Sequence, residues 1–263
     1  MSFRRFISLL GTACLALMSA PAQAAEVAAY HHVHLTATTA QEAADWYIEH
    51  MGCEDFGRAG ACQVGDVQII FFERDLQGGS VGTGVDHIGF SFRDLGTKMT
   101  GWKAAGLNVL EDTREIEGVF KLAFIEDPWG TKIEVVEDHE DLGFHHIHLR
   151  SQNPEETLAW YHNIFGGETD QMKGRINGVR YGRVWLLASR HAEGSLEPTQ
   201  GRAIDHLGWG FADLDAAAAE IRSKGVEFQM DPRPYTNPLG QDMKISFVLG
   251  PDDVRIEVVQ PGD

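Results

Sequence analysis

Basic residues are scarce in this chain. Its 22 lysines and arginines stand against 39 aspartates and glutamates, which gives a formal net charge of -17. Phosphate backbones and anionic membranes repel such a protein, so the charge excludes sequence-independent binding of nucleic acid. Only 9 prolines occur in 263 residues, which excludes a collagen-like chain, and an apolar share of 43% excludes a disordered one. The length and composition fit one large or two small domains with hydrophobic cores.

Long apolar runs are also absent, apart from one near the N-terminus. Residues 6–20 are apolar, follow Arg4 and Arg5, and precede an Ala-Gln-Ala sequence at 22–24. This order is typical of a signal peptide, and the stretch is too short to span a bilayer comfortably. We expect residues 1–24 to be cleaved, which leaves an exported chain of net charge -19. In a Gram-negative bacterium it would be periplasmic, and no later run is apolar enough to cross a membrane.

Cysteine is rare as well, with three residues at Cys14, Cys53 and Cys62. Cys14 lies in the predicted signal, in a poor match to a lipoprotein cleavage box, and Arg4-Arg5 is a poor match to a twin-arginine signal. A lipid-anchored form therefore stays open beside the soluble one. In an oxidising compartment Cys53 and Cys62 could form a disulfide, and two buried thiols are the alternative.

The strongest pattern in the sequence is an internal repeat. HHVHL at 31–35 recurs as HHIHL at 145–149, and DHIG at 86–89 recurs as DHLG at 205–208. Matching positions are 114 residues apart in the first pair and 119 in the second, so the copies differ by loop insertions. An acidic stretch at 138–143, which ends in glycine, is the natural linker between the copies.

Each copy is itself a doubled unit of strand, helix and further strands. Residues 32–37 alternate between apolar and polar, which is typical of a half-buried strand. Thr38 or Thr39 then caps a predicted helix that ends at Gly52. The same order of signals restarts at residue 86, and the second copy repeats both units. The chain therefore holds four such units.

Strand parity places histidines and glutamates where they could bind a cation. His87 shares a strand face with Gly89, whereas apolar residues take the other face, and His206 has the same setting. Small neighbours leave space for a cavity on this face. Glu134 and Glu257 lie in strongly apolar strands, where an unpaired carboxylate would be costly. A bound cation would remove that cost.

Two histidines and a carboxylate that converge from three strands form a facial triad with open coordination positions. Neutral imidazole and carboxylate suit Fe(II), Mn, Co, Ni or Zn. A single histidine on a strand is more often a core or surface residue. The appearance of the same set at matching positions in both copies favours metal binding.

These residues resemble a known family. His32 is followed fifteen residues later by Tyr47, and FIEDPWGTKIE at 124–134 is similar to the family's closing hairpin. With the tandem repeat, they resemble the vicinal oxygen chelate (VOC) superfamily, which contains glyoxalases, bleomycin-resistance proteins and extradiol dioxygenases. The resemblance implies an α+β fold of two tandem VOC domains, residues 29–138 and 144–260. Each domain would hold two βαβββ units that form an open mixed β-barrel with helices outside.

The resemblance also implies metal ligands, because family members use a His of the first strand, a His of the fifth and a Glu of the eighth. Carried over, the ligands are His32, His87 and Glu134 in the first copy, and His146, His206 and Glu257 in the second. Glu134 and Glu257 are also the candidate catalytic bases. Family members also exchange halves between copies, and the sequence leaves this open. Exchange would group His32 and Gln68 with His206 and Glu257, and His146 with His87 and Glu134.

A fourth ligand, Glu or Gln, occurs in family enzymes of the glyoxalase and epimerase type. Alignment of Gly65 with Gly182 places Gln68 at that position in the first copy and Trp185 in the second. We therefore expect a four-ligand site in the first copy, and in the second a three-ligand site or a packed aromatic in place of metal. One or two divalent ions would be bound.

Two arginines are candidate substrate-binding residues. Arg150 follows His146 by four residues on the same strand face, and Arg202 precedes His206 by four. Glyoxalase I has arginines at similar offsets that hold the carboxylates of glutathione, so an acidic ligand would suit this copy. Solvated surface arginines are the alternative. The segment 228–239 could form a lid over the site or an ordinary loop.

The resemblance favours an exported, metal-dependent lyase or isomerase of the glyoxalase type, acting on a small oxygen-rich substrate by metal chelation and proton transfer. An extradiol-type ring-cleaving dioxygenase is the first alternative, although Phe124 occupies a hairpin position where that signature has Tyr. A non-catalytic protein that binds a small molecule and confers resistance is the second. The expected partner is a small-molecule substrate, and the protein would be a monomer or homodimer.

Overall fold

The computed structural model describes residues 27–192 and 194–262. The predicted signal peptide, residues 1–24, lies outside the described residues. Within the described part, no helix has the length and apolar character needed to cross a membrane. The elements in chain order are β1 (Val27–Ala37), α1 (Ala40–Met51), β2 (Ala61–Val64), β3 (Val67–Glu73), β4 (Val85–Ser91), α2 (Leu95–Ala105), β5 (Asn108–Ile116), β6 (Phe120–Glu126), β7 (Lys132–Glu137), β8 (Gly143–Ser151), α3 (Pro154–Phe165), β9 (Glu168–Met172), β10 (Ile176–Tyr181), β11 (Val184–Arg190), β12 (Ile204–Phe211), α4 (Leu214–Ser223), β13 (Phe228–Thr236), β14 (Asp242–Leu249), the 3-10 turn η1 (Pro251–Asp253) and β15 (Arg255–Gln260).

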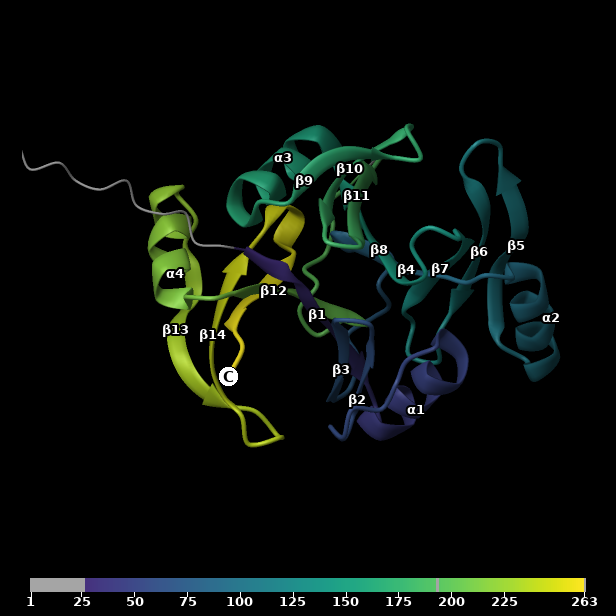
Figure 1. Ribbon diagram of the computed structural model, residues 1–263, viewed down its shortest axis with the longest axis horizontal. Helices are drawn as coiled ribbons and strands as arrows, with labels where there is room; N and C mark the ends of the chain where they lie inside the picture. The colour runs from purple at the N-terminus through teal and green to yellow at the C-terminus, as the bar shows by residue number, and fades with distance from the viewer. Residues whose placement is uncertain (1–26, 193, 263) are drawn as a thin grey trace, which may run out of the picture.

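The strands form two open sheets, and each sheet takes one half from each sequence repeat. Their strand orders are β13-β14-β15-β12-β1-β3-β2 and β5-β6-β7-β4-β8-β11-β10-β9. Figure 1 shows the purple β1 beside β12 of the second repeat, while β4 to β7 of its own repeat belong to the other sheet. The sequence left the pairing open, and the structure has exchanged halves. The segments 29–138 and 144–260 are repeats in sequence that each contribute to both sheets.

The fold is α+β, as predicted, and both sheets are mixed. In the first sheet β1 pairs antiparallel with β12 and parallel with β3. In the second sheet β8 pairs antiparallel with β4 and parallel with β11. Among the described helices, α1 packs on β2 and β3, and α3 packs on β10 and β11. The sheets do not close into a barrel, and the helices leave one face of each sheet free for a site.

Three of the four predicted βαβββ units are complete, and the first one is shorter. After α1 the chain forms only β2 and β3, and one isolated bridge between Glu54 and Gln63 stands in place of a further strand. The predicted disulfide between Cys53 and Cys62 is present beside this bridge, with their Cα atoms 5.7 Å apart. A covalent link therefore holds the short hairpin of residues 54–61.

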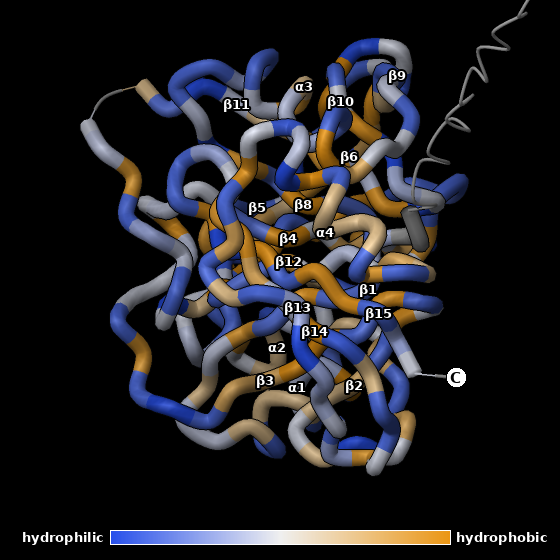
Figure 2. Tube along the Cα trace, turned by 90° about the vertical axis from the view of Figure 1, so that its left-hand side faces the viewer, coloured by the Kyte–Doolittle hydropathy of each residue, from blue (hydrophilic) through white to orange (hydrophobic). Residues whose placement is uncertain are grey.

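The helix-facing side of the sheets forms the hydrophobic core, with the parity that the sequence predicts. Val33 and Leu35 of β1 are fully buried on this side, and Ile88 and Phe90 of β4 occupy the matching positions in the other sheet. Figure 2 shows the hydrophobic residues gathered along the central strands and the hydrophilic ones around them. The histidines of the same strands therefore point to the opposite face.

The segment 228–239 forms neither a free lid nor an irregular loop, because most of it is the edge strand β13. It pairs antiparallel with β14, and Pro232 and Pro234 lie within it. Proline is tolerated at a sheet edge, where one side of the strand needs no N–H donor. The hairpin turn at 237–241 then lies beside the first sheet's free face.

A buried tyrosine shows how the two repeats differ in their closing hairpins. The Tyr47 hydroxyl of α1 donates a hydrogen bond to Asp127 Oδ2 at 2.9 Å, and both side chains are buried. Burial raises the pKa of Asp127 to about 6 against the hydrogen bonds from Thr131, Tyr47 and Trp129. In the second repeat glycine replaces this aspartate, and the Tyr161 hydroxyl has no hydrogen-bond partner among the described residues.

We expect Tyr47→Phe to lower the free energy of unfolding by about 1–3 kcal/mol, because Oδ2 of the buried Asp127 loses the hydrogen bond that Tyr47 donates. The matched variant Tyr161→Phe removes a hydroxyl that donates to no described group, and should change stability by less than about 0.5 kcal/mol. Chemical denaturation of both variants measures the difference. Equal losses in the two variants would contradict this contrast.

Candidate metal centres

Site A consists of His32, His206 and Glu257, which come from β1, β12 and β15 of the first sheet. His206 Nε2 lies 3.0 Å from Glu257 Oε2, and His32 Nε2 lies 3.2 Å from the same oxygen. All three side chains are buried, with Glu257 only 8% exposed. Because β1 belongs to the first repeat and β12 and β15 to the second, both repeats are needed to build this site.

Site B is the counterpart in the second sheet and consists of His87, Glu134 and His146. His87 Nε2 lies 2.9 Å from Glu134 Oε2, and His146 Nε2 lies 3.2 Å from the same oxygen. These residues come from β4, β7 and β8, so the repeats again contribute jointly. The six histidines and glutamates that the resemblance implied as ligands therefore gather into two triads, in the exchanged grouping.

Two glycines make room for the histidine rings. His32 lies opposite Gly208 in the antiparallel pair of β1 and β12, and a Cβ on Gly208 would be 2.1 Å from His32 Cε1. Gly89 has the same relation to His146, again at 2.1 Å. The space that small residues leave beside His206 and His87 is thus occupied by a histidine of the facing strand.

Carboxylates behind the histidines fix their orientation. His206 Nδ1 lies 2.6 Å from Asp205 Oδ1, and Arg255 and Arg74 contact the same carboxylate at 3.1 and 3.5 Å. In site B, His87 Nδ1 lies 2.7 Å from Asp86 Oδ2. A carboxylate on the outer ring nitrogen sets the tautomer and leaves the inner nitrogen facing a metal, which is the usual outer-shell arrangement of metal-binding histidines.

The electrostatics of site A keep its carboxylate ionised. Burial favours a neutral Glu257, but contacts with the His206 and His32 rings outweigh it and hold the Glu257 pKa well below its usual range. Burial lowers the pKa of His32, so this imidazole stays neutral. A neutral imidazole and an ionised carboxylate are the forms that bind a divalent ion.

Unsatisfied nitrogens show that a metal ion fits both sites. His32 Nε2 and His146 Nε2 are buried without a hydrogen-bond partner, because their 3.2 Å contacts to glutamate are not aligned as hydrogen bonds. His34 joins site A and His148 joins site B, so that each site offers four possible ligand atoms within 4.8 Å of one another. His34 also stacks on His206, with ring centres 4.4 Å apart, and so supports that ring.

Site A opens into a cavity of about 500 Å³. Gln68 and His31 line it close to the triad, and Phe72 and Phe247 supply apolar wall. Gln68 lies opposite His32 in the parallel pair of β1 and β3. This position fits the proposed fourth ligand, and ligation by Gln68 remains a prediction.

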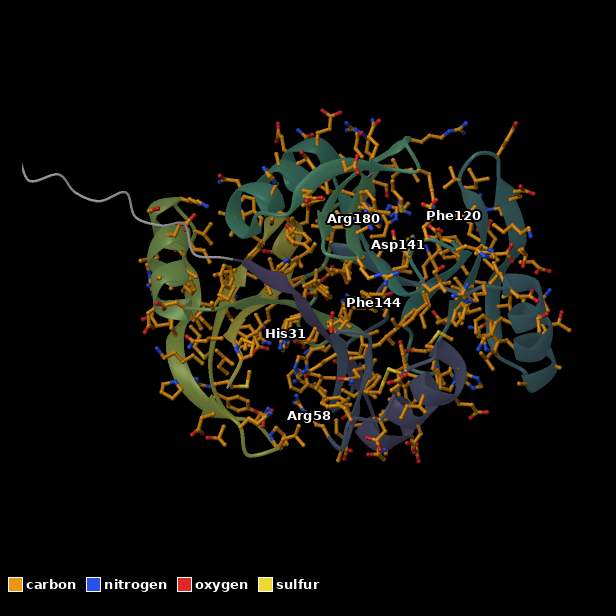
Figure 3. All side chains as sticks on the ribbon, in the orientation of Figure 1. His31, Arg58, Phe120, Asp141, Phe144 and Arg180 are labelled. Atoms are coloured by element: carbon orange, nitrogen blue, oxygen red, sulfur yellow. A yellow bond between two sulfur atoms is a disulfide. The ribbon has the colours of Figure 1, made fainter. Side chains whose placement is uncertain are left out.

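Site B is filled by side chains. Trp185 lies opposite His146 in the register that Gln68 has opposite His32, as the sequence alignment predicts. It belongs to a compact cluster of buried apolar residues with Phe120, Leu122, Val136, Met172 and Leu187. The hairpin of β9 and β10 brings Met172 into this cluster, and the first unit has no such strand pair. Figure 3 places Phe120 among the strands of this second sheet, away from His31 and Arg58 of site A.

The two arginines predicted to bind substrate do not line the site A cavity. Arg150 Nε lies 3.5 Å from Asp86 Oδ1, behind site B, and its Nη1 donates to Ser189 Oγ at 2.9 Å. Arg202 pairs with Glu197 at 3.8 Å. Their substrate role remains a prediction for which this cavity offers no contact.

The sequence analysis missed three arginines that do line the cavity, Arg58, Arg74 and Arg255. Arg255 stacks on Phe247, with its Cζ 3.8 Å from the ring centre, and Arg74 lies 4.3 Å from the Phe72 ring centre. One signal was available, because the Gly-Arg pair at 57–58 aligns with that at 174–175 when Gly65 is matched to Gly182.

Comparison with known proteins identifies a family domain in the second repeat. Residues 143–258 match the model of the Glyoxalase/Bleomycin resistance protein/Dioxygenase superfamily. This segment is a domain of that superfamily. Over most of its length the chain also has the fold of glyoxalase I from Zea mays. One structure of that protein, a V278E mutant, has a TM-score of 0.72 at 17% identity and covers 88% of this chain and 92% of its own.

Two further relatives carry different names. A putative dioxygenase from Bacillus subtilis has a TM-score of 0.66 at 17% identity, covering 90% of this chain and 86% of its own. The probable chloroplastic lactoylglutathione lyase of Arabidopsis thaliana is 27% identical over 185 residues, which is 65% of this chain. The chain spans about half the length of that curated relative, since the match covers 51% of it.

Gly208→Ala tests the geometry of site A directly. The new Cβ would displace the His32 ring, so we expect metal affinity at site A to fall about tenfold or more, as when a supporting group is lost. Equilibrium dialysis against Zn(II), followed by elemental analysis, measures it. Gly101→Ala in α2 is the control, because its Cβ would meet nothing within 4 Å. Unchanged zinc binding in Gly208→Ala would contradict the arrangement of β1 against β12.

Proposed function

We propose that the protein is a metal-dependent lyase or isomerase of the glyoxalase type, with site A as its active site. The observation that carries this proposal is the contrast between the sites. Both have a His-His-Glu triad. Among the described residues, His32 and Glu257 of site A line a cavity of about 500 Å³, whereas apolar side chains pack around site B. The superfamily domain at residues 143–258 and the fold shared with glyoxalase I support the same reaction class.

His32, His206 and Glu257 would hold the metal ion, with Gln68 as the additional ligand. A divalent ion bound there would polarise a substrate carbonyl through two vicinal oxygens, which makes the proton on the adjacent carbon more acidic. Asp205 would keep the His206 ring in place throughout. The aromatic walls at Phe72 and Phe247 would exclude water from the reacting atoms.

Glu257 is the group that would move the proton. It lines the cavity, and its low pKa keeps it ionised, so one of its oxygens can accept a proton from the substrate carbon and return it to the neighbouring carbon. A single carboxylate suffices for such a transfer between adjacent atoms. Glu134 has the same setting in site B, but the cluster around Trp185 occupies the space that a substrate would need.

We also propose that the protein acts outside the cytoplasm. The basic and apolar pattern at residues 1–24 supports export, and the disulfide between Cys53 and Cys62 fits an oxidising compartment. Glutathione chemistry is mainly cytosolic, so the substrate we propose is a different small, oxygen-rich compound. Site B would then act as a structural element at the centre of the second sheet.

Paired glutamate variants test the assignment. Glu257→Gln removes the base and a ligand of site A, so turnover should fall by about 10²–10⁴-fold, the usual contribution of a positioned general base. Glu134→Gln changes the same residue type in site B and should leave turnover within about twofold. Proton exchange and isomerisation of 2-hydroxy and 2-oxo carbonyl compounds, followed by NMR in D₂O with added Mn, Co, Ni or Zn, provide the assay.

The outcome of the same assay separates the alternatives. Loss of turnover in Glu134→Gln alone would move the active site to site B. Oxygen uptake with catechols in the iron-loaded protein, without proton exchange, would replace the isomerase with a ring-cleaving dioxygenase. Failure of the protein to bind any of these metals would leave a small-molecule binding protein.

A further inference from the structure

Arg58 is a positively charged group that faces the site A cavity without a partner. It is half-buried and lines the cavity, and its guanidinium has no hydrogen bond or ion pair with any described residue. The other two arginines of the cavity both contact Asp205. A half-buried guanidinium with no hydrogen bond or direct ion pair is costly unless a ligand supplies these contacts.

The second repeat shows what the same arginine does when its site is closed. Arg175, which aligns with Arg58, donates from Nη1 to the Glu117 backbone carbonyl at 2.7 Å and packs against Gly118 at the turn of the β5–β6 hairpin. In site B the arginine therefore links the third βαβββ unit to the second one by a hydrogen bond, above a site that apolar side chains fill. In site A the corresponding turn, at 237–241, accepts no such bond, and Arg58 faces open space instead.

The hairpin that carries Arg58 is held firmly. The disulfide between Cys53 and Cys62 closes its base, and Glu54 and Gln63 exchange two backbone hydrogen bonds beside it, at 2.8 and 2.9 Å. Gly60 N–H also donates to Gln41 Oε1 of α1 at 3.1 Å. Because the backbone of this hairpin is already ordered, binding of a ligand restricts only the arginine side chain, which favours binding. Figure 3 shows Arg58 at the edge of the molecule below His31.

The charges of the cavity favour an anion, although the protein as a whole is strongly acidic. Among its lining residues Glu257 is the one carboxylate, against three arginines. Asp205, which contacts Arg74 and Arg255, adds a second negative charge, so that one positive charge is in excess. In a chain with 39 acidic and 22 basic residues, this excess of positive charge is a local feature of the cavity. A metal ion at site A would compensate Glu257 and increase the excess.

We propose that Arg58 binds an anionic group of the substrate, a carboxylate or a phosphate, while the vicinal oxygens of the same molecule face His32, His206 and Glu257. The substrate is thus a small acid with two functional ends. This inference rests on the proposed function for the second end only. Arginine suits the first end because its planar guanidinium can bind two oxygens of a carboxylate or phosphate at once.

A matched set of ligands separates the two ends. Acetohydroxamate offers two vicinal oxygens to a metal, the monohydroxamate of succinic acid adds a carboxylate, and the corresponding phosphonate adds a phosphate-like group. The dissociation constants for Co(II)-loaded protein come from the change in the cobalt absorption spectrum. We expect at least one of the two acids to bind about 10–100-fold more tightly than acetohydroxamate, as for a hydrogen bond to a charged group. Whichever acid gains more identifies the anion.

Arg58→Gln should remove that gain and leave acetohydroxamate binding within about twofold. Arg58→Lys should keep part of the gain, because it retains the charge and loses the two-oxygen contact. Arg175→Gln is the matched control and should behave like the wild type. Equal binding of all three ligands by the wild type, or loss of the gain in Arg175→Gln as well, would overturn the proposal.

Calorimetric titration of the metal-free protein with the same acids distinguishes failure of the proposed metal-dependent function from failure of the proposed anion site. Weaker binding that still requires Arg58 is expected, because the guanidinium contact does not need the metal. If cobalt fails to bind at site A but this binding persists, the metal-dependent function fails and the anion site stands. If Arg58→Gln changes nothing in either titration, the anion site fails whatever the metal does.

Discussion

The packing of a histidine ring over a glycine of the other repeat is the contact on which the rest of the structure depends. His32 fits against β12 only because residue 208 has no side chain, and His146 fits against β4 only because residue 89 has none. These two contacts lie at the antiparallel pairs that join the repeats, β1 with β12 and β4 with β8. Pairing of the repeats and assembly of both His-His-Glu triads are therefore one event. A chain that folded with each repeat closed on itself would group different histidines and glutamates.

The two sites have the same types of candidate ligand, but they differ in the side chains that surround these ligands. The ligands lie on strands whose other face is the hydrophobic core, so any change there disturbs folding. The walls differ most in the strands after α1 and α3, because the first unit has two strands there and a disulfide, whereas the third unit has three strands. The fuller unit brings Met172 and Trp185 into site B, and the shorter one leaves a cavity beside Gln68. The gap left by the shorter unit is what gives Arg58 a cavity to face.

Local pattern predicted many of the helices and strands, and the resemblance predicted which histidines and glutamates to consider as ligands, a role that stays a prediction. The alternation around His32 and His87, the helix ends at Gly52 and Gly106, and the alignment of Gln68 with Trp185 all appear in the structure. The pairing of the halves could not be predicted, because both repeats carry the same strand pattern and either partner satisfies it. Arg58 was not predicted because the feature that distinguishes it, a guanidinium without a hydrogen bond, depends on its surroundings in the folded protein. The contrast with the hydrogen-bonded Arg175 shows this feature.

We infer that the exchanged halves build a metal centre from His32, His206 and Glu257. Anomalous diffraction from a crystal loaded with Mn, Co or Zn would test this inference, because the signal locates the ion without reference to activity. We expect an anomalous peak within bonding distance, about 2.0–2.2 Å, of the inner nitrogens of both histidines and of a Glu257 oxygen. A peak that groups His32 with His87 and Glu134, or a loaded crystal with no peak at site A, would contradict it.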